Sequence, residues 1–152
     1  MTEQEFRIKF KKQQFQLRNV LNRDAAIVAG KTASDMFAKN FERESWFGKP
    51  WQEVQRRMPY NYRNGKQVKN YHRGADLTRP ILTGRTAVLR RSIRYKPLGR
   101  GGVVVFSDAS YASYHNRGAG HMPKRQFIGP HPSVTKAIIR EVNRKINSII
   151  KQ

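Results

Sequence analysis

The chain has 152 residues, with 31 Lys and Arg against 10 Asp and Glu, and a formal net charge of +21 at pH 7. Such an excess repels itself in a compact state and attracts polyanions, so we expect nucleic acid nearby. The absence of cysteine excludes disulfides and thiolate metal sites. No window predicts a membrane-spanning helix or a cleaved signal, so we expect a soluble protein of one domain's length.

Residues 3–44 predict one long helix or two consecutive helices. Their apolar side chains mostly recur at helical spacing, and a strand would need alternation. These side chains are Phe6, Phe10, Leu17, Val20, Leu21, Ile27, Val28, Met36, Phe37 and Phe41. Glycine lowers helix propensity, so Gly30 predicts a break or bend between Leu21 and Lys31.

Residues 45–80 mix aromatic side chains, turn formers and cations, which predicts a long basic loop or arm. Trp46 and Trp51 are expected to pack on the core or on a neighbouring subunit. The alternation of cations with tyrosines suits contact with a phosphate backbone, without sequence readout. The alternative reading of each single cation is a solvated position on a basic loop.

Three shorter elements follow in the chain. Thr83 is expected to cap a short helix that ends near Ser92 and turns Leu89 inward. Residues 93–95 and 103–107 predict two strands of a hairpin, with a loop rich in glycine and proline between them.

The last third of the chain predicts two helices. Residues 111–116 form a short one stopped by Gly118, and the second begins near Ser133 and carries a stripe of apolar residues. The predicted fold class is α+β, with a long N-terminal helix, a small antiparallel β-sheet with a hairpin, and a C-terminal helix. We expect residues 1–152 to form a single domain with a long basic loop at about 45–80.

Catalytic chemistry is not indicated. Asp76 and Asp108 are the only acidic residues between positions 54 and 140, whereas a nuclease needs clustered carboxylates to hold a metal. The four histidines lack the paired spacing of a zinc site. We therefore expect no enzyme, no metal and no cofactor.

The most specific indication of function comes from three short sequence motifs, here called phrases, and from their order along the chain. The first runs from Leu82-Thr83-Gly84-Arg85 to Leu89-Arg90-Arg91-Ser92-Ile93, the second is Tyr111-Ala112-Ser113-Tyr114-His115-Asn116-Arg117-Gly118, and the third is Met122-Pro123-Lys124-Arg125-Gln126-Phe127-Ile128-Gly129. Together they resemble the virion-morphogenesis or tail-completion proteins of tailed bacteriophages, small neck proteins of the Mu-like and lambda-like type. The chain departs from that family at Gln126, where proline is usual.

The resemblance implies an α+β subunit of a homo-oligomeric ring at the head–tail junction or tail end. Implied partners are portal or head-completion proteins, tail-tube or tail-terminator proteins, and genomic DNA contacted without sequence preference, with no membrane. The implied location is the neck or tail of the virion, and the host cytoplasm during assembly. A subunit about 35 Å wide leaves an opening of about 35 Å in a ring of six, which admits a duplex. A head-side adaptor, a tail terminator and a tail-completion factor all remain open.

The residues singled out by the sequence fall into two groups with different expected roles. Those expected to maintain the fold are Thr83, Gly84, Leu89, Ser92, Tyr111, Tyr114, His115, Gly118, Met122, Pro123, Arg125 and Phe127. Cations expected to face the DNA channel or a subunit interface are Arg56, Arg57, Arg63, Lys66, Lys69, Arg73, Arg85, Arg90, Arg91, Lys96 and Arg100. The alternative function is a stand-alone basic nucleic-acid-binding protein, for which the net charge is the main support.

Overall fold

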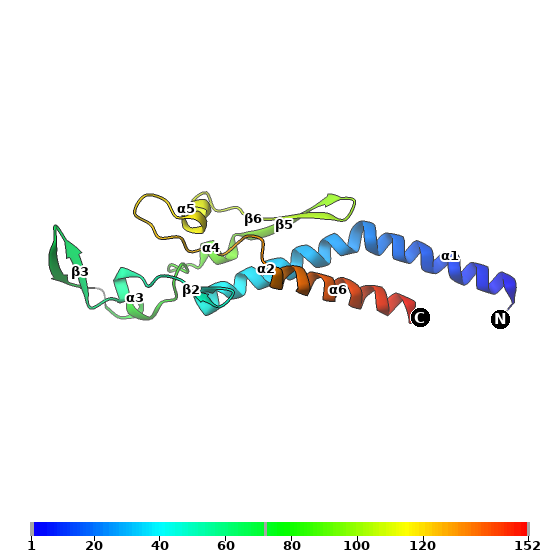
Figure 1. The fold of residues 1–152 in the computed structure, drawn as a ribbon, viewed down its shortest axis with the longest axis horizontal. Coiled ribbons are helices and arrows are strands. Elements are labelled where there is room, and N and C mark those ends of the chain that lie inside the picture. The colour runs from blue at the N-terminus through cyan, green and yellow to red at the C-terminus, as the bar shows by residue number, and fades with distance from the viewer. Residues whose placement is uncertain (1, 72, 152) are drawn as a thin grey trace. The chain divides into compact units, whose positions relative to one another are not determined.

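The computed structural model describes residues 2–71 and 73–151, so His72 lies outside the described residues. The chain forms two compact units. The first comprises Met1–Met36, Arg94–Phe106 and Pro130–Gln152, and the second comprises Phe37–Ile93 and Ser107–Gly129. Long terminal helices and two-stranded antiparallel hairpins confirm the α+β class (Figure 1). Within the described part of the chain, no helix is long and apolar enough to cross a membrane.

The predicted N-terminal helix exists, and its irregularity is a π turn. Helix α1 (Glu3–Asn19) leads into the π-helical turn η1 (Val20–Asp24), and α2 (Ala25–Arg43) follows. A capping box starts α1, because Thr2 Oγ1 accepts the N–H of Glu5 while the Glu5 carboxylate accepts the N–H of Thr2. The irregularity begins at the edge of the predicted interval, and Gly30 itself lies in regular helix.

Gly30 is explained by packing in the first unit. Strands β5 (Ile93–Gly99) and β6 (Gly102–Ser107) form the predicted hairpin, both longer than expected. A Cβ built at Gly30 would lie 2.4 Å from Cδ2 of Tyr95 and 2.9 Å from Cγ2 of Val103. Only glycine leaves room for the tyrosine ring against the helix, which explains a residue of poor helix propensity at this position.

The C-terminal helix matches its prediction closely. Helix α6 (Pro132–Ile150) begins one residue before the predicted start, with proline in its first turn. The ring Nδ1 of His131 accepts the N–H of Ser133 at 3.2 Å and so caps the helix. Val134 and Ala137 are buried, whereas Ile139 on another face is exposed.

The second unit is built from short elements. They are β1 (Ser45–Trp46), β2 (Lys49–Pro50), the 3₁₀ turn η2 (Gln55–Arg57), β3 (Tyr60–Arg63), β4 (Lys66–Lys69), α3 (Ala75–Thr78), α4 (Val88–Arg91) and α5 (Ala112–Arg117). The segment at 45–80 therefore contains two hairpins, β1–β2 and β3–β4, where the sequence predicts a loop. Asn64 and Gly65, at φ 49° and 74°, form the two-residue turn that joins β3 to β4.

The predicted start of the helix at Thr83 is wrong, although a helix does end near Ser92. The Thr83 hydroxyl donates to the carbonyl of Pro80 at 2.7 Å and caps no helix. Helix α4 begins only at Val88, after Ala87 in the left-handed conformation at φ 50°. Leu89 is buried as expected, and the short helix α5 is confirmed, with Gly118 at φ 77° beyond its end.

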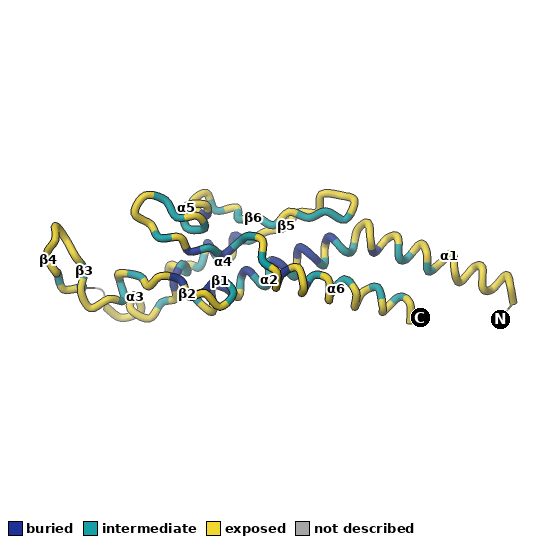
Figure 2. The backbone as a smooth tube through the Cα atoms, viewed as in Figure 1, coloured by how far each residue is buried: buried dark blue, intermediate teal, exposed yellow. Residues whose placement is uncertain are grey.

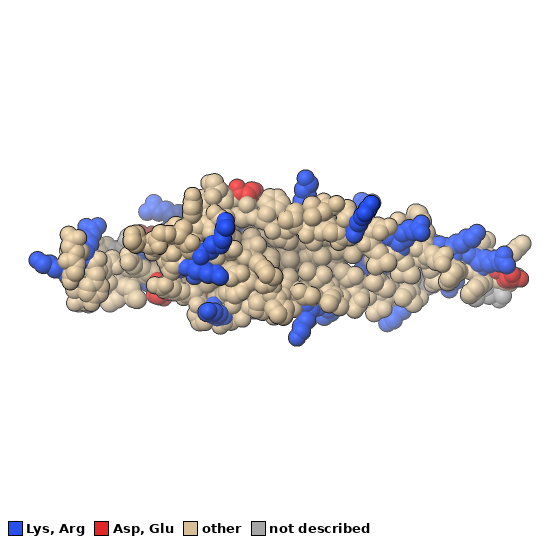
Figure 3. Space-filling model, turned by 45° about the horizontal axis from the view of Figure 1, so that its top comes forward, with Lys and Arg blue, Asp and Glu red and all other residues tan. Residues whose placement is uncertain are grey.

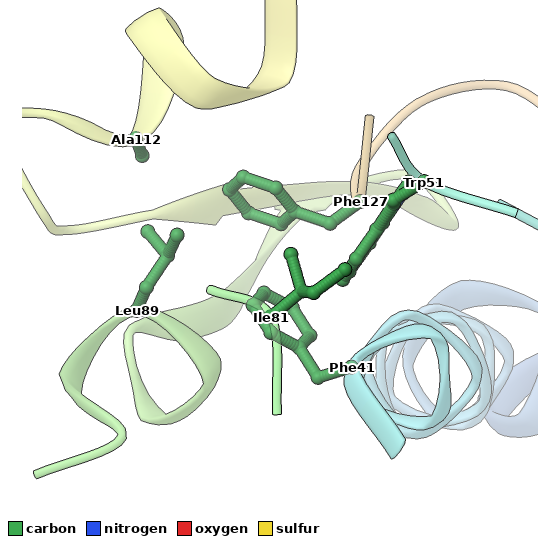
Figure 4. Close-up of a cluster of buried hydrophobic side chains, with 6 residues drawn as sticks. All are labelled: Phe41, Trp51, Ile81, Leu89, Ala112 and Phe127. Atoms are coloured by element: carbon green, nitrogen blue, oxygen red, sulfur yellow. The ribbon is translucent and has the colours of Figure 1, made fainter. Parts of the chain in front are cut away.

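Large apolar side chains meet in the second unit. Figure 4 shows Phe127 between Leu89 and Ala112 on one side and Trp51, Ile81 and Phe41 on the other. The ring centroids of Phe41 and Phe127 are 5.1 Å apart, and Phe41 meets Trp51 edge-on at 5.5 Å. Packing of both tryptophans is confirmed, since Trp51 is buried and the half-buried Trp46 stacks on Phe37. Figure 2 shows buried residues along α2 and in this cluster, whereas α1 has no buried residue.

Candidate nucleic-acid interface

The three family phrases converge on one framework in the second unit. Leu89 of the first phrase, Ala112 of the second and Phe127 of the third share the apolar cluster. Asn116 adds polar bonds, because its Oδ1 accepts the N–H groups of Phe127 at 2.8 Å and Ile128 at 3.0 Å. Its Nδ2 donates to the carbonyl of Ile128 at 3.0 Å. The second and third phrases therefore hold each other in place.

Arg125 anchors the third phrase to the segment after β2. The side chain is buried, its Nε donates to the carbonyl of Gln52 at 2.9 Å, and its Nη2 donates to that of Glu53 at 3.2 Å. The indole Nε1 of Trp51 completes the junction by donating to the carbonyl of Gln126 at 2.9 Å. Burial lowers the pKa of Arg125, and the charge of Arg56 lowers it further. A charged group at this depth is tolerated because backbone carbonyls accept hydrogen bonds from its N–H groups.

The remaining phrase residues divide by exposure. Ser92 is buried, and its hydroxyl bonds to the Leu89 carbonyl and the Ser107 hydroxyl. Half-buried positions are Thr83, His115, Gly118 and Pro123, and exposed positions are Gly84, Tyr111, Tyr114 and Met122. The ring of His115 meets that of Tyr111 edge-on at 6.0 Å.

Arg56 and Arg57 are bonded inside the fold. Arg56 donates to the carbonyls of Asp76 at 2.9 Å and Pro80 at 3.0 Å, and Arg57 pairs with both carboxylate oxygens of Glu44. Burial lowers the pKa of Arg56, whereas the hydrogen bond that Arg57 donates to Glu44 raises the pKa of Arg57. Both predicted channel residues have most of their donors occupied, which favours a role in holding the chain at 76–80.

Two further predicted cations also have internal partners. Arg90 forms an ion pair with Glu42 of α2, and its side chain remains 39% exposed. Arg91 donates to the carbonyl of Thr86 while remaining exposed. Their charges are available to a polyanion, but their donors are partly used.

The other predicted cations lie on the surface. Arg63, Lys66 and Lys69 belong to the β3–β4 hairpin, Arg73 and Arg85 lie in the segments around α3, and Lys96 and Arg100 lie on the β5–β6 hairpin. All seven are exposed. Of these seven, five belong to the second unit, and three of the five lie on the β3–β4 hairpin, whereas Lys96 and Arg100 belong to the first unit.

The β3–β4 hairpin is fixed at its base by Asn70. Its Nδ2 donates to the carbonyls of Gln55 at 2.8 Å and Met58 at 2.7 Å, and its backbone N–H donates to that of Pro59 at 3.0 Å. An isolated two-stranded hairpin is marginally stable in water. The Asn70 clamp joins this one to η2 and so holds it as a defined arm.

Acidic side chains are scarce around these cations. On the face in Figure 3, blue Lys and Arg side chains are many and red Asp and Glu side chains are few. No acidic residue occurs between Glu53 and Asp76, and no ion pair found among the described residues includes Arg63, Lys66 or Lys69. In the same described residues, no group of three His, Asp or Glu is placed to hold a metal ion.

Sequence reasoning missed Asn70 and Asn116 as anchors. Asn70 belongs to no recognisable motif, and Asn116 lies in the second phrase at a position to which the sequence assigns no role. Their partners are backbone groups that only the fold brings together. The β3–β4 hairpin had a signal, because Asn64-Gly65 lies between Tyr-x-Tyr and Lys-x-Val. Comparison with family models, curated proteins and solved structures finds no match to this chain.

Proposed function

We propose that this protein is a structural component of the neck or tail of a tailed bacteriophage, acting in tail completion or head–tail joining. Its subunits form a closed ring, of six copies in the simplest arrangement, around the DNA channel. Exposed cations on the β3–β4 and β5–β6 hairpins meet the genomic DNA without reading its sequence. The ring binds head-side and tail-side virion proteins and performs no chemical step.

The convergence of the three phrases is the observation that carries this proposal. Leu89 of the first phrase, Ala112 and Asn116 of the second, and Phe127 of the third form one packed, hydrogen-bonded framework. Motifs that maintain a shared fold are expected to pack in this way, whereas motifs matched by chance have no reason to meet.

The exposed apolar side chains of α1 support assembly into a larger structure. Phe6, Ile8, Phe10 and Phe15 are each at least half exposed, and the rings of Phe6 and Phe10 stack with centroids 6.1 Å apart. Apolar groups gathered on a helix with no buried residue are characteristic of protein–protein contacts. Repeated contacts around a ring would cover them in every subunit.

Assembly is tested with the purified full-length protein by native mass spectrometry and negative-stain microscopy, with and without the neighbouring virion proteins. We expect closed rings, and we expect Phe6→Ser combined with Phe10→Ser to shift the population toward monomers. Gln14→Ser, an exposed change on the same helix, is the matched control and should leave rings intact.

The location is tested by mass spectrometry of purified virions of a phage that carries the gene. The expected result is a small, fixed number of copies per particle, together with unjoined heads and tails when the gene is deleted. Finished virions without the protein, or infectious particles after deletion, would overturn the proposal.

A stand-alone nucleic-acid-binding protein is the second candidate, and the exposed cations and tyrosines of the β3–β4 hairpin favour it. It requires tight, salt-sensitive binding of nucleic acid by the monomer. Affinity that appears only with ring formation would argue against this candidate, and so would virion incorporation.

A further inference from the structure

The β3–β4 hairpin presents two chemically different faces. Cross-strand partners share a face, so Tyr60 opposite Lys69 and Tyr62 opposite Gln67 lie on one side. Arg63 opposite Lys66 and Asn61 opposite Val68 lie on the other side. One face therefore offers aromatic rings with one cation, and the other offers paired cations near the turn.

The aromatic face is open to solvent. Tyr60 is 51% exposed and Tyr62 is 74% exposed, and Tyr71, just beyond β4, is 76% exposed. Residues two apart on a strand lie about 7 Å from each other, so each ring has room for its own flat partner. Exposed tyrosines at this spacing on a clamped hairpin form a stacking platform of the kind that binds bases.

The opposite face lacks a counter-charge. Arg63 and Lys66 face each other directly across the strands, an arrangement that destabilises a hairpin unless an anion lies between them. A depression of about 320 Å³ adjoins Arg63 and is lined by Asn61, Arg63, Val68, Lys69, Asn70 and Tyr71. A phosphate group supplies the negative charge and the acceptor oxygens that an arginine and a lysine bind.

The two faces together select one class of partner. The same hairpin face of a second copy would bring like cations against each other. A base-paired duplex offers its phosphates but keeps its base faces stacked inside the helix. An unpaired strand offers phosphates and free base faces at once.

We propose that the β3–β4 hairpin binds single-stranded nucleic acid, with Tyr60 and Tyr62 stacking on successive bases and Arg63 and Lys66 holding the phosphate backbone. The inference deepens the nucleic-acid contact in the proposed function and rests on it. The strand is an unpaired end or a locally opened stretch of the nucleic acid that the protein encloses.

The test measures fluorescence anisotropy of labelled strands with the full-length protein over a salt series. The probes are an oligothymidylate, an abasic strand of the same length and charge, and a duplex of that length. We expect the oligothymidylate to bind most tightly. Tyr60→Ala and Tyr62→Ala should each weaken it by about 5- to 150-fold and leave the abasic strand unaffected.

Two sets of variants separate stacking from charge. Arg63→Gln combined with Lys66→Gln should weaken all three probes and reduce the slope of log affinity against log salt by about 1.4 for single strands. Tyr114→Ala, which removes an exposed tyrosine outside the hairpin, is the matched control and should change nothing. Unchanged thermal unfolding of each variant shows that the fold is retained.

Three outcomes would overturn the inference. They are equal affinity for the oligothymidylate and the abasic strand, tighter binding of the duplex, or equally effective competition by polyglutamate, which would indicate an acidic protein partner. None of them depends on ring formation or on virion incorporation. Failure of this inference is therefore distinguishable from failure of the proposed function.

Discussion

The guanidinium of Arg57 meets both carboxylate oxygens of Glu44, with Nη2 to Oε1 at 2.5 Å and Nη1 to Oε2 at 2.8 Å. Glu44 Oε1 also accepts the N–H of Ile81 at 2.8 Å, and Arg57 Nη2 donates to the carbonyl of Arg79 at 2.8 Å. The pair therefore ties the end of α2 to the segment that enters the apolar cluster. The hydrogen bond from Arg57 is the main cause of a lowered pKa at Glu44.

Replacing Glu44 by Gln is expected to lower the free energy of unfolding by about 1–3 kcal/mol at pH 7, because the largely buried Arg57 loses its closer charged partner and keeps only Glu53 at 3.4 Å. Urea unfolding followed by tryptophan fluorescence measures the change. Glu3→Gln, at an exposed ion pair on α1, is the control and should cost less than about 1 kcal/mol.

The same pair predicts a pH dependence. The pKa of Glu44 lies below its usual 4.5 in the folded protein, so its contribution is complete above about pH 4.5 and is lost as the pH falls below that value. The stability of the wild-type protein should therefore fall more steeply between pH 5 and pH 3 than that of Glu44→Gln. Parallel curves for the two proteins in this range would contradict the assignment.

His115 predicts a second pH dependence at milder acidity. Burial, followed by the charge of Arg125, lowers the pKa of this imidazole below its usual 6.5. The unfolded chain then binds a proton more readily, so stability is complete above about pH 6.5 and falls as the pH drops below it. In His115→Phe, the thermal midpoint should change less between pH 7.5 and pH 5.5 than in the wild-type protein.

Asn116 is expected to be the most sensitive of the polar side chains that bond the second phrase to the third. Asn116→Ala removes three hydrogen bonds and leaves the N–H groups of Phe127 and Ile128 without their acceptor. A loss of about 2–4 kcal/mol in the free energy of unfolding should follow. Asn116→Asp keeps the acceptor and should cost less, and equal losses for both variants would mean that the Oδ1 bonds contribute little.

Gly30→Ala tests the packing of Tyr95 on α2. Alanine favours a helix by about 1 kcal/mol over glycine, but its Cβ would overlap the Tyr95 ring. We expect a net destabilisation of about 1–2 kcal/mol, because overpacking outweighs the gain in propensity. The loss should shrink when Tyr95 is also changed to Ala, and purely additive effects in this double-mutant cycle would refute the contact.

Elements with a local cause were predictable from sequence. The stripe on α6, the length of the N-terminal helix and the β5–β6 hairpin follow from periodicity and turn residues. The Thr83 cap failed because a threonine hydroxyl donates to a turn carbonyl as readily as it caps, and here Pro80 supplies that carbonyl. The position of the π turn has no simple sequence signal.

The basic residues of the candidate site could be predicted from sequence as a group. Which of them bind within the fold and which remain exposed could not. Sequence alone marks the cations of 56–73 as a group and gives no means of separating Arg57, paired with Glu44, from Lys66, which is exposed. That separation depends on Glu44 approaching from another part of the chain. Tertiary contacts therefore decide which charges maintain the fold and which remain for a partner.

The π turn between α1 and α2 also determines how the side chains of α1 are rotated about the helix axis relative to those of α2. Such a turn is one surplus residue in an α-helix, so residues 3–19 are rotated by about 100° about the helix axis relative to an uninterrupted helix. Deleting Asn22 would restore the regular α-helical hydrogen bonds and would turn the half-buried side chains of Gln13, Gln16 and Leu17 toward water. One extra residue in the helix thus determines which side of α1 faces the rest of its unit.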